Sequence, residues 1–274
     1  MTKSSFWFVL SQIEGHPVFR NASPHSQAAV TLQLAVALDR LGNYGNGVSL
    51  GRTLILWGIG KGTCVAYTTR VLEALNDLSS TFVVWPNKRK RRAMSRRMAS
   101  QGFKGCVGFI DGTTFPLSQK PAVDGECYFD RKSRYSINGQ VVCDDNRRII
   151  AFYGVLEDLR TQARCSLLRE PLQDSKKHLF FSRGEYLIGR WASLKELRIQ
   201  LNKKEDMERI LCWITACVVH HNMLLGQNDN WTSDDESSAE DSDGPEEEES
   251  ETESEDESDD DEFVFRRHLK KKAI

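Results

Sequence analysis

The chain has 274 residues, of which 39% are hydrophobic, so it is long enough and apolar enough to fold around a substantial core. Its formal net charge of −2 conceals a segregation of charge, because residues 233–262 carry 19 acidic residues and no Lys or Arg. Five basic residues follow that run, which leaves 32 basic and 20 acidic residues in 1–232, a net charge of +12. A basic body favours polyanionic partners such as DNA.

Several classes of protein are disfavoured by composition. No run of 18 apolar residues exists, and the N-terminus lacks the apolar core and cleavage site of a signal peptide, so we expect no membrane partner. Seven cysteines without a CxxC pair indicate a reducing compartment and no zinc ribbon. Four residues that could suggest a metal cluster share one apolar helical pattern and are predicted to be buried core: Cys212, Cys217, His220 and His221.

Residues 23–80 are predicted to form three helices. Ser23 and Pro24 can begin the first, which runs to about Leu41. Ser49 can cap a second, over Leu50–Trp57, and Thr63 opens a third that ends near Leu78. This spacing is typical of a helix-turn-helix DNA-binding unit. It fits equally well a helical unit whose only role is packing.

A basic linker is predicted over residues 81–101. Seven of the ten residues from 88 to 97 are basic. The five consecutive ones are Lys88, Arg89, Lys90, Arg91 and Arg92. The run favours nuclear import or phosphate contact, and the alternative is a solvated helix face.

From residue 102 the pattern changes to that of an α/β layer, expected to extend to 226. Strands are predicted over Cys106–Asp111, Tyr135–Cys143, Ile149–Val155 and Glu185–Gly189, and helices over Thr161–Leu168, Ala192–Leu201 and Asp206–Leu225. Asp111 would then lie at the end of a strand and at the edge of the sheet. Phosphodiester cleavage by paired divalent ions requires several such carboxylates to converge.

The sequence of this region resembles the DDE nuclease domain of Harbinger-type transposases and of the nucleases derived from them. The residues that carry the resemblance are Gly108–Thr113, Tyr128–Lys132, Tyr135–Asn138, Val142–Asp144, Gly154, Asp158, Gly184–Leu187 and His221–Asn222. The resemblance covers about residues 25–225. It implies a truncated RNase H-like fold, preceded by the small helical domain, and DNA cleavage that depends on Mg²⁺ or Mn²⁺.

The resemblance places the first catalytic, metal-binding Asp on Asp111, and the best further acid is Asp158. The family's second Asp and its Glu are missing, because Tyr186–Gly189 runs directly into Arg190 and Trp191. We therefore expect weak or absent metal binding, impaired cleavage and an open sheet edge at Asp111. Arg131, Lys132 and Arg134, beside this edge, are predicted phosphate contacts, with solvent-facing turn charges as the alternative.

Residues 227–274 form an acidic segment with a basic end, and their composition predicts disorder. Basic nuclear proteins are expected partners of this tail. Three interpretations remain open: a nuclear transposase-derived endonuclease, a non-catalytic nuclear DNA-binding protein, and a decayed transposon product or a gene model with a faulty junction at Gly189. None of them requires a small-molecule cofactor.

Overall fold

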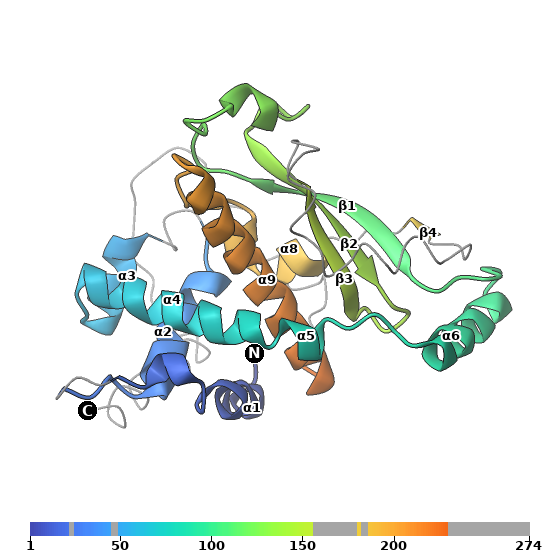
Figure 1. Ribbon diagram of the computed structural model, residues 1–274, viewed down its shortest axis with the longest axis horizontal. Coiled ribbons are helices and arrows are strands. Elements are labelled where there is room, and N and C mark those ends of the chain that lie inside the picture. Colours follow the sequence, from blue (N-terminus) through green and yellow to red (C-terminus); the bar gives the residue numbers. More distant parts are fainter. Residues whose placement is uncertain (22–24, 45–48, 156–179, 182–185, 230–274) are drawn as a thin grey trace, which may run out of the picture.

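The computed structural model describes residues 1–21, 25–44, 49–155, 180–181 and 186–229. Figure 1 shows a group of helices on one side of the molecule and a twisted sheet on the other. In chain order the elements are α1 (Lys3–Ile13), η1 (Pro17–Phe19), α2 (Val30–Gly42), α3 (Leu50–Trp57), α4 (Lys61–Asp77), α5 (Ser79–Phe82), α6 (Lys88–Ser100), β1 (Phe109–Pro116), η3 (Gly125–Tyr128), β2 (Ser136–Cys143), β3 (Ile149–Val155), β4 (Phe180–Phe181), α8 (Tyr186–Arg190), η4 (Ala192–Leu194) and α9 (Lys204–Gly226).

The three helices predicted for residues 23–80 are α2, α3 and α4. Helix α3 has the predicted bounds, because the Ser49 side chain accepts the Arg52 N–H at its start and Gly58 ends it with a φ of 64°. Helix α2 begins later than predicted, at Val30. The Gln33 side chain donates to the carbonyl of Ala28 (2.8 Å), which holds the segment before α2 out of the helix.

A buried carboxylate joins α2 to α3. Asp39 of α2 accepts a hydrogen bond from Trp57 Nε1 (3.3 Å) and pairs with Arg52 (3.6 Å). Its side chain is 2% exposed, so these contacts offset the cost of taking the charge out of water. Two of the polar groups on α3 are thus committed to packing against α2.

The sheet has the order β3-β2-β1-β4. Strands β1, β2 and β3 are antiparallel neighbours, and β4 pairs in parallel with Phe109 and Ile110 of β1. The predicted strand over Ile149–Val155 has its predicted bounds, and the one predicted at Tyr135–Cys143 begins one residue later, at Ser136. Strand β1 differs from its prediction, since it begins at Phe109 and continues five residues beyond Asp111.

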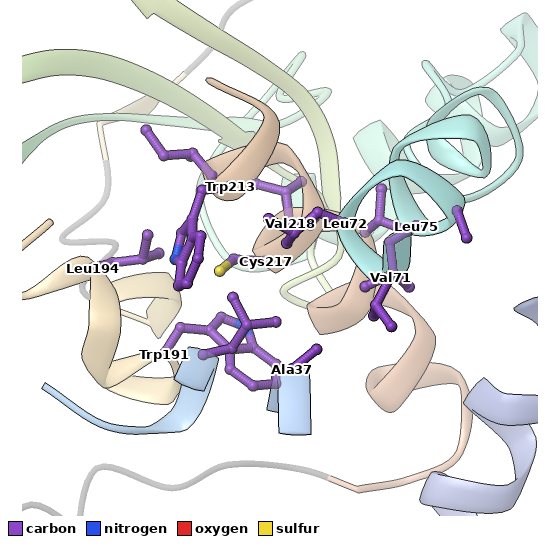
Figure 2. Close-up of a cluster of buried hydrophobic side chains, with 14 of the residues drawn as sticks. Ala37, Val71, Leu72, Leu75, Trp191, Leu194, Trp213, Cys217 and Val218 are labelled. Atoms are coloured by element: carbon purple, nitrogen blue, oxygen red, sulfur yellow. The ribbon is translucent and has the colours of Figure 1, made fainter. Parts of the chain in front are cut away.

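Helix α9 lies between α4 and the sheet and carries much of the core. Figure 2 shows side chains from three parts of the chain meeting those of α9. They are Ala37 of α2, then Val71, Leu72 and Leu75 of α4, and finally Trp191 and Leu194; α9 contributes Trp213, Cys217 and Val218. The same buried cluster includes Phe115, Ile137 and Val141 of the sheet. Helices and sheet therefore share one hydrophobic core.

The predicted burial of the cysteine and histidine group on α9 is confirmed for three of its four members. Cys217 and His220 are fully buried, His221 is 4% exposed, and Cys212 is half-buried. The His220 ring stacks on Trp191, with ring centroids 4.6 Å apart. These side chains act as core residues in the packing of α9.

Two predicted elements near residue 190 are wrong. The strand predicted over Glu185–Gly189 is instead helix α8, because Leu187 and Trp191, one helical turn apart, are both buried and joined by a backbone hydrogen bond (3.1 Å). The helix predicted over Ala192–Leu201 is replaced after η4 by extended chain. There Leu197 N–H donates to Pro116 and Leu201 accepts from Ala122.

Some expectations concern residues outside those the structure describes. They are the helix at Thr161–Leu168, the candidate acid Asp158 and most of the acidic tail, residues 230–274. Among the helices that are described, none has the length and apolarity needed to cross a membrane.

Candidate nucleic-acid interface

Helix α6 carries the basic run that the sequence singled out. Asn87 begins the helix by accepting the Lys90 N–H with its side chain (3.0 Å). Met94 and Met98, one turn apart, form the buried side of α6 and pack with Cys106 and Phe109. Figure 1 shows α6 far from α1–α4, beside the start of β1. The predicted linker is thus a helix anchored by one narrow apolar face.

The opposite face of α6 is a stripe of arginines. Arg89, Arg92 and Arg96 are separated by three and four residues, which places them on one side of a helix, about 10 Å from first to last. All three are exposed, and exposed Lys88 and Lys90 flank them. Among the described residues, no carboxylate forms an ion pair with any of these five side chains. We call Lys88, Arg89, Lys90, Arg92 and Arg96 the basic face of α6.

The other two basic residues of the run have structural partners. Arg91 donates from Nη1 to the carbonyl of Pro86 (2.7 Å). Arg97 binds Asp145 through two hydrogen bonds, Nε to Oδ2 at 2.6 Å and Nη2 to Oδ1 at 3.0 Å. The bond to Asp145 raises the pKa of Arg97, and this pair fixes α6 to the turn between β2 and β3.

The basic face costs stability in the isolated protein. The first turn of α6 contains three basic residues and no acid, which opposes the helix dipole. Like charges three and four residues apart repel each other by a few tenths of a kcal/mol per pair, about 0.2–0.5. A bound polyanion would offset both penalties.

The second predicted basic group lies at the other end of the β1–β2 hairpin. Arg131, Lys132 and Arg134 are exposed in a turn whose backbone N–H groups at 132 and 134 bind Asp130 Oδ1 (2.8 and 3.0 Å). The turn precedes Ser136, which pairs with Pro116, whereas Phe109 at the opposite end contacts α6. Eight residues of strand separate the two groups by roughly 25 Å.

Asp111 does not lie where the sequence placed it. It is the third residue of β1 and pairs with Val141 of β2, so the expected strand end is wrong. On the other side of β1 the described part of β4 pairs with Phe109 and Ile110 and does not extend to Asp111, so the expected open edge stays a prediction. The expectation of a strand end failed because strand β1 continues through Gly112 and Thr113, where the sequence suggested a turn. Asp111 is half-buried and is in the half of β1 that is nearer α6.

Two acids surround the thiol of Cys143. Burial, followed by the nearby charges of Asp144 and Asp111, raises the pKa of Cys143 to about 12. Asp144 has a role in the turn after β2, since its Oδ1 accepts the N–H groups of Asn146 (2.8 Å) and Arg148 (2.9 Å). Its neighbour Asp145 is bound to Arg97.

The described carboxylates therefore do not form the site that paired metal ions require. Within residues 1–155 and 186–229, apart from the gaps given above, no group of three His, Cys, Asp or Glu side chains is placed to hold a metal ion. Asp158, the other acid suggested by the sequence, is outside the described residues.

Arg190 forms a buried ion pair with Asp229. Its Nη2 binds Asp229 Oδ1 at 3.0 Å, and the two side chains are 6% and 10% exposed. Asp229 also accepts the backbone N–H of Thr2 (2.8 Å). The pair thus ties α8 and the segment after α9 to the N-terminus, and Arg190 is not part of the sheet.

The sequence placed Arg96 in the basic run, and its spacing of four from Arg92 on a helix puts it on the arginine stripe. Sequence reasoning missed the acidic partner that fixes α6 through Arg97. Asp145 had no such signal, because its partner Arg97 is 48 residues away in sequence.

Fold and surface define a mixed α/β protein with a four-stranded sheet and a strongly basic surface helix. Over 124 residues the chain is 32% identical to the protein Antagonist of Like Heterochromatin Protein 1 of Arabidopsis thaliana. That stretch covers 44% of this chain and 30% of the relative, so the chain matches less than a third of the relative's length. No protein-family model and no solved structure matches the chain.

Proposed function

We propose that this chain is a nuclear DNA-binding protein, similar to Harbinger-type transposase-derived nucleases, that binds DNA phosphates through α6 and has little or no cleavage activity. The observation that carries the proposal is the arginine stripe on α6, opposite a buried methionine face. Arg89, Arg92 and Arg96 span about 10 Å, a length over which duplex DNA presents about six phosphates. Guanidinium groups bind phosphate oxygens with two parallel hydrogen bonds.

Two further observations support the relation to transposase-derived proteins. Three antiparallel strands followed by a fourth that is parallel to the first is the order with which an RNase H-like sheet begins, and β3-β2-β1-β4 has this order. The Arabidopsis relative is named as an antagonist of a heterochromatin protein, which favours a nuclear location for this chain as well. The basic run on α6 is also of the kind that nuclear import signals use.

The carboxylates support binding without cleavage. Asp144 and Asp145 are engaged by backbone N–H groups and by Arg97, and the chain carries Arg190 where the resemblance calls for an acid. A clamp of two ions needs several ligands around Asp111. DNA binding by α6 requires none of them, so the basic surface can act after the catalytic set is lost.

The salt dependence of DNA binding tests the proposal. Affinity for a fluorescent duplex is measured by anisotropy between 50 and 300 mM salt, for the full chain and for the triple variant Arg89→Gln, Arg92→Gln, Arg96→Gln. Each phosphate contact contributes about 0.9 to the slope of log K against log salt, so the triple variant should reduce the slope by about 2.7.

Two control variants locate the effect. Arg20→Gln with Lys203→Gln removes two exposed charges away from α6 and should leave the slope unchanged within error. Arg131→Gln, Lys132→Gln and Arg134→Gln together measure whether the second basic group also contacts DNA. The proposal would be overturned if the wild type and the α6 triple variant had equal slopes. The slopes would also have to be equal after the Asp and Glu residues of 234–262 are replaced by Asn and Gln in both proteins.

A further inference from the structure

We infer that the acidic run of residues 234–262 binds within the same chain to the basic face of α6 and competes there with DNA. The competition rests on the proposed function, whereas the intramolecular contact does not. The run contains 19 acidic residues and no Lys or Arg, so it is the strongest concentration of negative charge in the protein.

Charge complementarity is the first step of the argument. The basic face presents five exposed cations that pair with no carboxylate among the described residues. Other cations of the body are already paired, as Arg52 is with Asp39 and Arg190 with Asp229. The basic face of α6 gathers five such cations within nine residues, which makes it a denser group than Arg131, Lys132 and Arg134.

The position of α9 brings the acidic run within reach of α6. Asn222, near the end of α9, donates to the carbonyl of Phe82 at 2.9 Å. Lys88 follows Phe82 by six residues, so α6 begins at most about 20 Å from this point. Figure 1 likewise shows the end of α9 beside α5, which leads into α6.

The length of chain after α9 is sufficient. The N–H of Asp229 bonds to Leu224 (3.1 Å), so the last described residue stays near the end of α9. Between Asp229 and the middle of the acidic run lie about 20 residues, which can reach up to about 65 Å when fully extended. That reach exceeds the roughly 20 Å between Phe82 and the start of α6, so the chain is long enough for the acidic run to contact α6.

The consequence is a filter on DNA binding. The acidic run covers α6 in part of the molecules, and only molecules with an uncovered α6 can bind DNA. The apparent affinity for any DNA is therefore the intrinsic affinity multiplied by the uncovered fraction. Duplex DNA has the higher charge density and displaces the run at sites that offer additional contacts. Raising the salt concentration weakens the internal contact as well as DNA binding.

Carbodiimide cross-linking tests the contact directly, because it joins a lysine amine to a neighbouring carboxylate. We expect links from Lys88 and Lys90 to acids within 234–262 in monomeric full-length protein, and their loss at 1 M salt. Lys203, exposed at the start of α9, and Lys132, at the far end of the hairpin, are the internal controls. Links confined to dimers, or links as frequent at Lys203 and Lys132 as on α6, would overturn the inference.

The effect on DNA is measured with a full-length variant whose 19 Asp and Glu in 234–262 become Asn and Gln. This variant should bind duplex DNA about tenfold more tightly at 50 mM salt, and the ratio should approach one at 500 mM. Adding the three Arg→Gln changes on α6 should abolish the difference.

The two experiments separate the inference from the proposed function. If the links form but the neutralised variant binds no DNA, the contact stands and DNA binding by α6 fails. If the variant and the wild type bind DNA equally, no links form and the α6 triple variant still lowers the salt slope, DNA binding by α6 stands and the internal contact fails.

Discussion

The side-chain amide of Asn222 binds both backbone groups of Ile149, accepting its N–H (2.9 Å) and donating to its carbonyl (2.7 Å). The amide thereby takes the place of a neighbouring strand at the outer edge of β3, where the pairing with β2 shifts register. Its Nδ2 also donates to the carbonyl of Phe82, the last residue of α5. One buried residue of α9 thus joins the sheet to the segment that leads to α6.

Replacing Asn222 by Ala should destabilise the protein by about 2–5 kcal/mol, because it leaves buried N–H and carbonyl groups without partners. The midpoint of urea denaturation measures this change. Gln12→Ala, at an exposed position of α1, should alter the unfolding free energy by less than about 0.5 kcal/mol. A loss below 1 kcal/mol for Asn222→Ala would mean that water satisfies the freed groups.

Stability should fall between pH 7 and pH 5 because of two buried histidines. Burial, followed by the charge of Arg190, lowers the pKa of His220 from 6.5 to about 3. Burial also lowers the pKa of His221, to about 4, against the opposing effect of its bond to the Arg147 carbonyl. Below pH 6.5 the unfolded chain binds protons that the folded chain does not, so each ring should cost on the order of 2 kcal/mol at pH 5.

His220→Phe tests the assignment of this pH dependence. Neither ring nitrogen of His220 has a hydrogen-bond partner among the described residues, so Phe should preserve the stacking on Trp191 and the stability at pH 7. The difference in unfolding free energy between pH 7 and pH 5 should then be about half as large. An unchanged difference would assign the pH dependence to other groups.

The pair of Arg97 and Asp145 should hold α6 in place. Arg97→Gln removes both hydrogen bonds and leaves the Asp145 side chain, 7% exposed, with an uncompensated charge. We expect a loss of roughly 1 kcal/mol in stability, since Arg97 itself is about half exposed. Amide exchange should accelerate over residues 88–100 more than over α4.

A charge swap provides the control for this pair. Arg97→Asp combined with Asp145→Arg should restore part of the exchange protection that either single change removes. Protection that is unchanged in Arg97→Gln would show that Met94 and Met98 alone anchor the helix.

The elements that local sequence signals determine could be predicted from the sequence. Ser49 and Gly58 mark the two ends of α3, and alternating burial marks β2. The predicted start of α9, Asp206, lies two residues after the observed start, Lys204. The Asp206 carboxylate accepts the N–H groups of Asn202 and Lys203, so it caps the helix from inside the first turn.

The failures involve contacts between distant segments. The apolar run at 186–189 suits a strand or a helix, and burial of Leu187 and Trp191 on one side decides for α8. The segment at 195–201 has helical spacing, yet hydrogen bonds of Leu197 and Leu201 to the chain after β1 keep it extended. The same limit applies to the interface, where spacing identified the basic run but Asp145 depends on the tertiary fold.

Magnesium should have little effect on this protein. Asp144 and Asp145 are already bound within the fold, and the described residues supply no group of three metal ligands. If the dissociation constant is 10 mM or weaker, 10 mM Mg²⁺ or Mn²⁺ stabilises the folded state by at most about 0.4 kcal/mol. Thermal unfolding with and without the ion measures this shift, and supercoiled plasmid should stay unnicked under the same conditions.

The control is Asp111→Ala, which removes the carboxylate that the resemblance assigns as the first metal ligand. This variant should match the wild type in both assays. Nicking that requires Mg²⁺ and disappears in Asp111→Ala would show that acids beyond the described residues complete a working site.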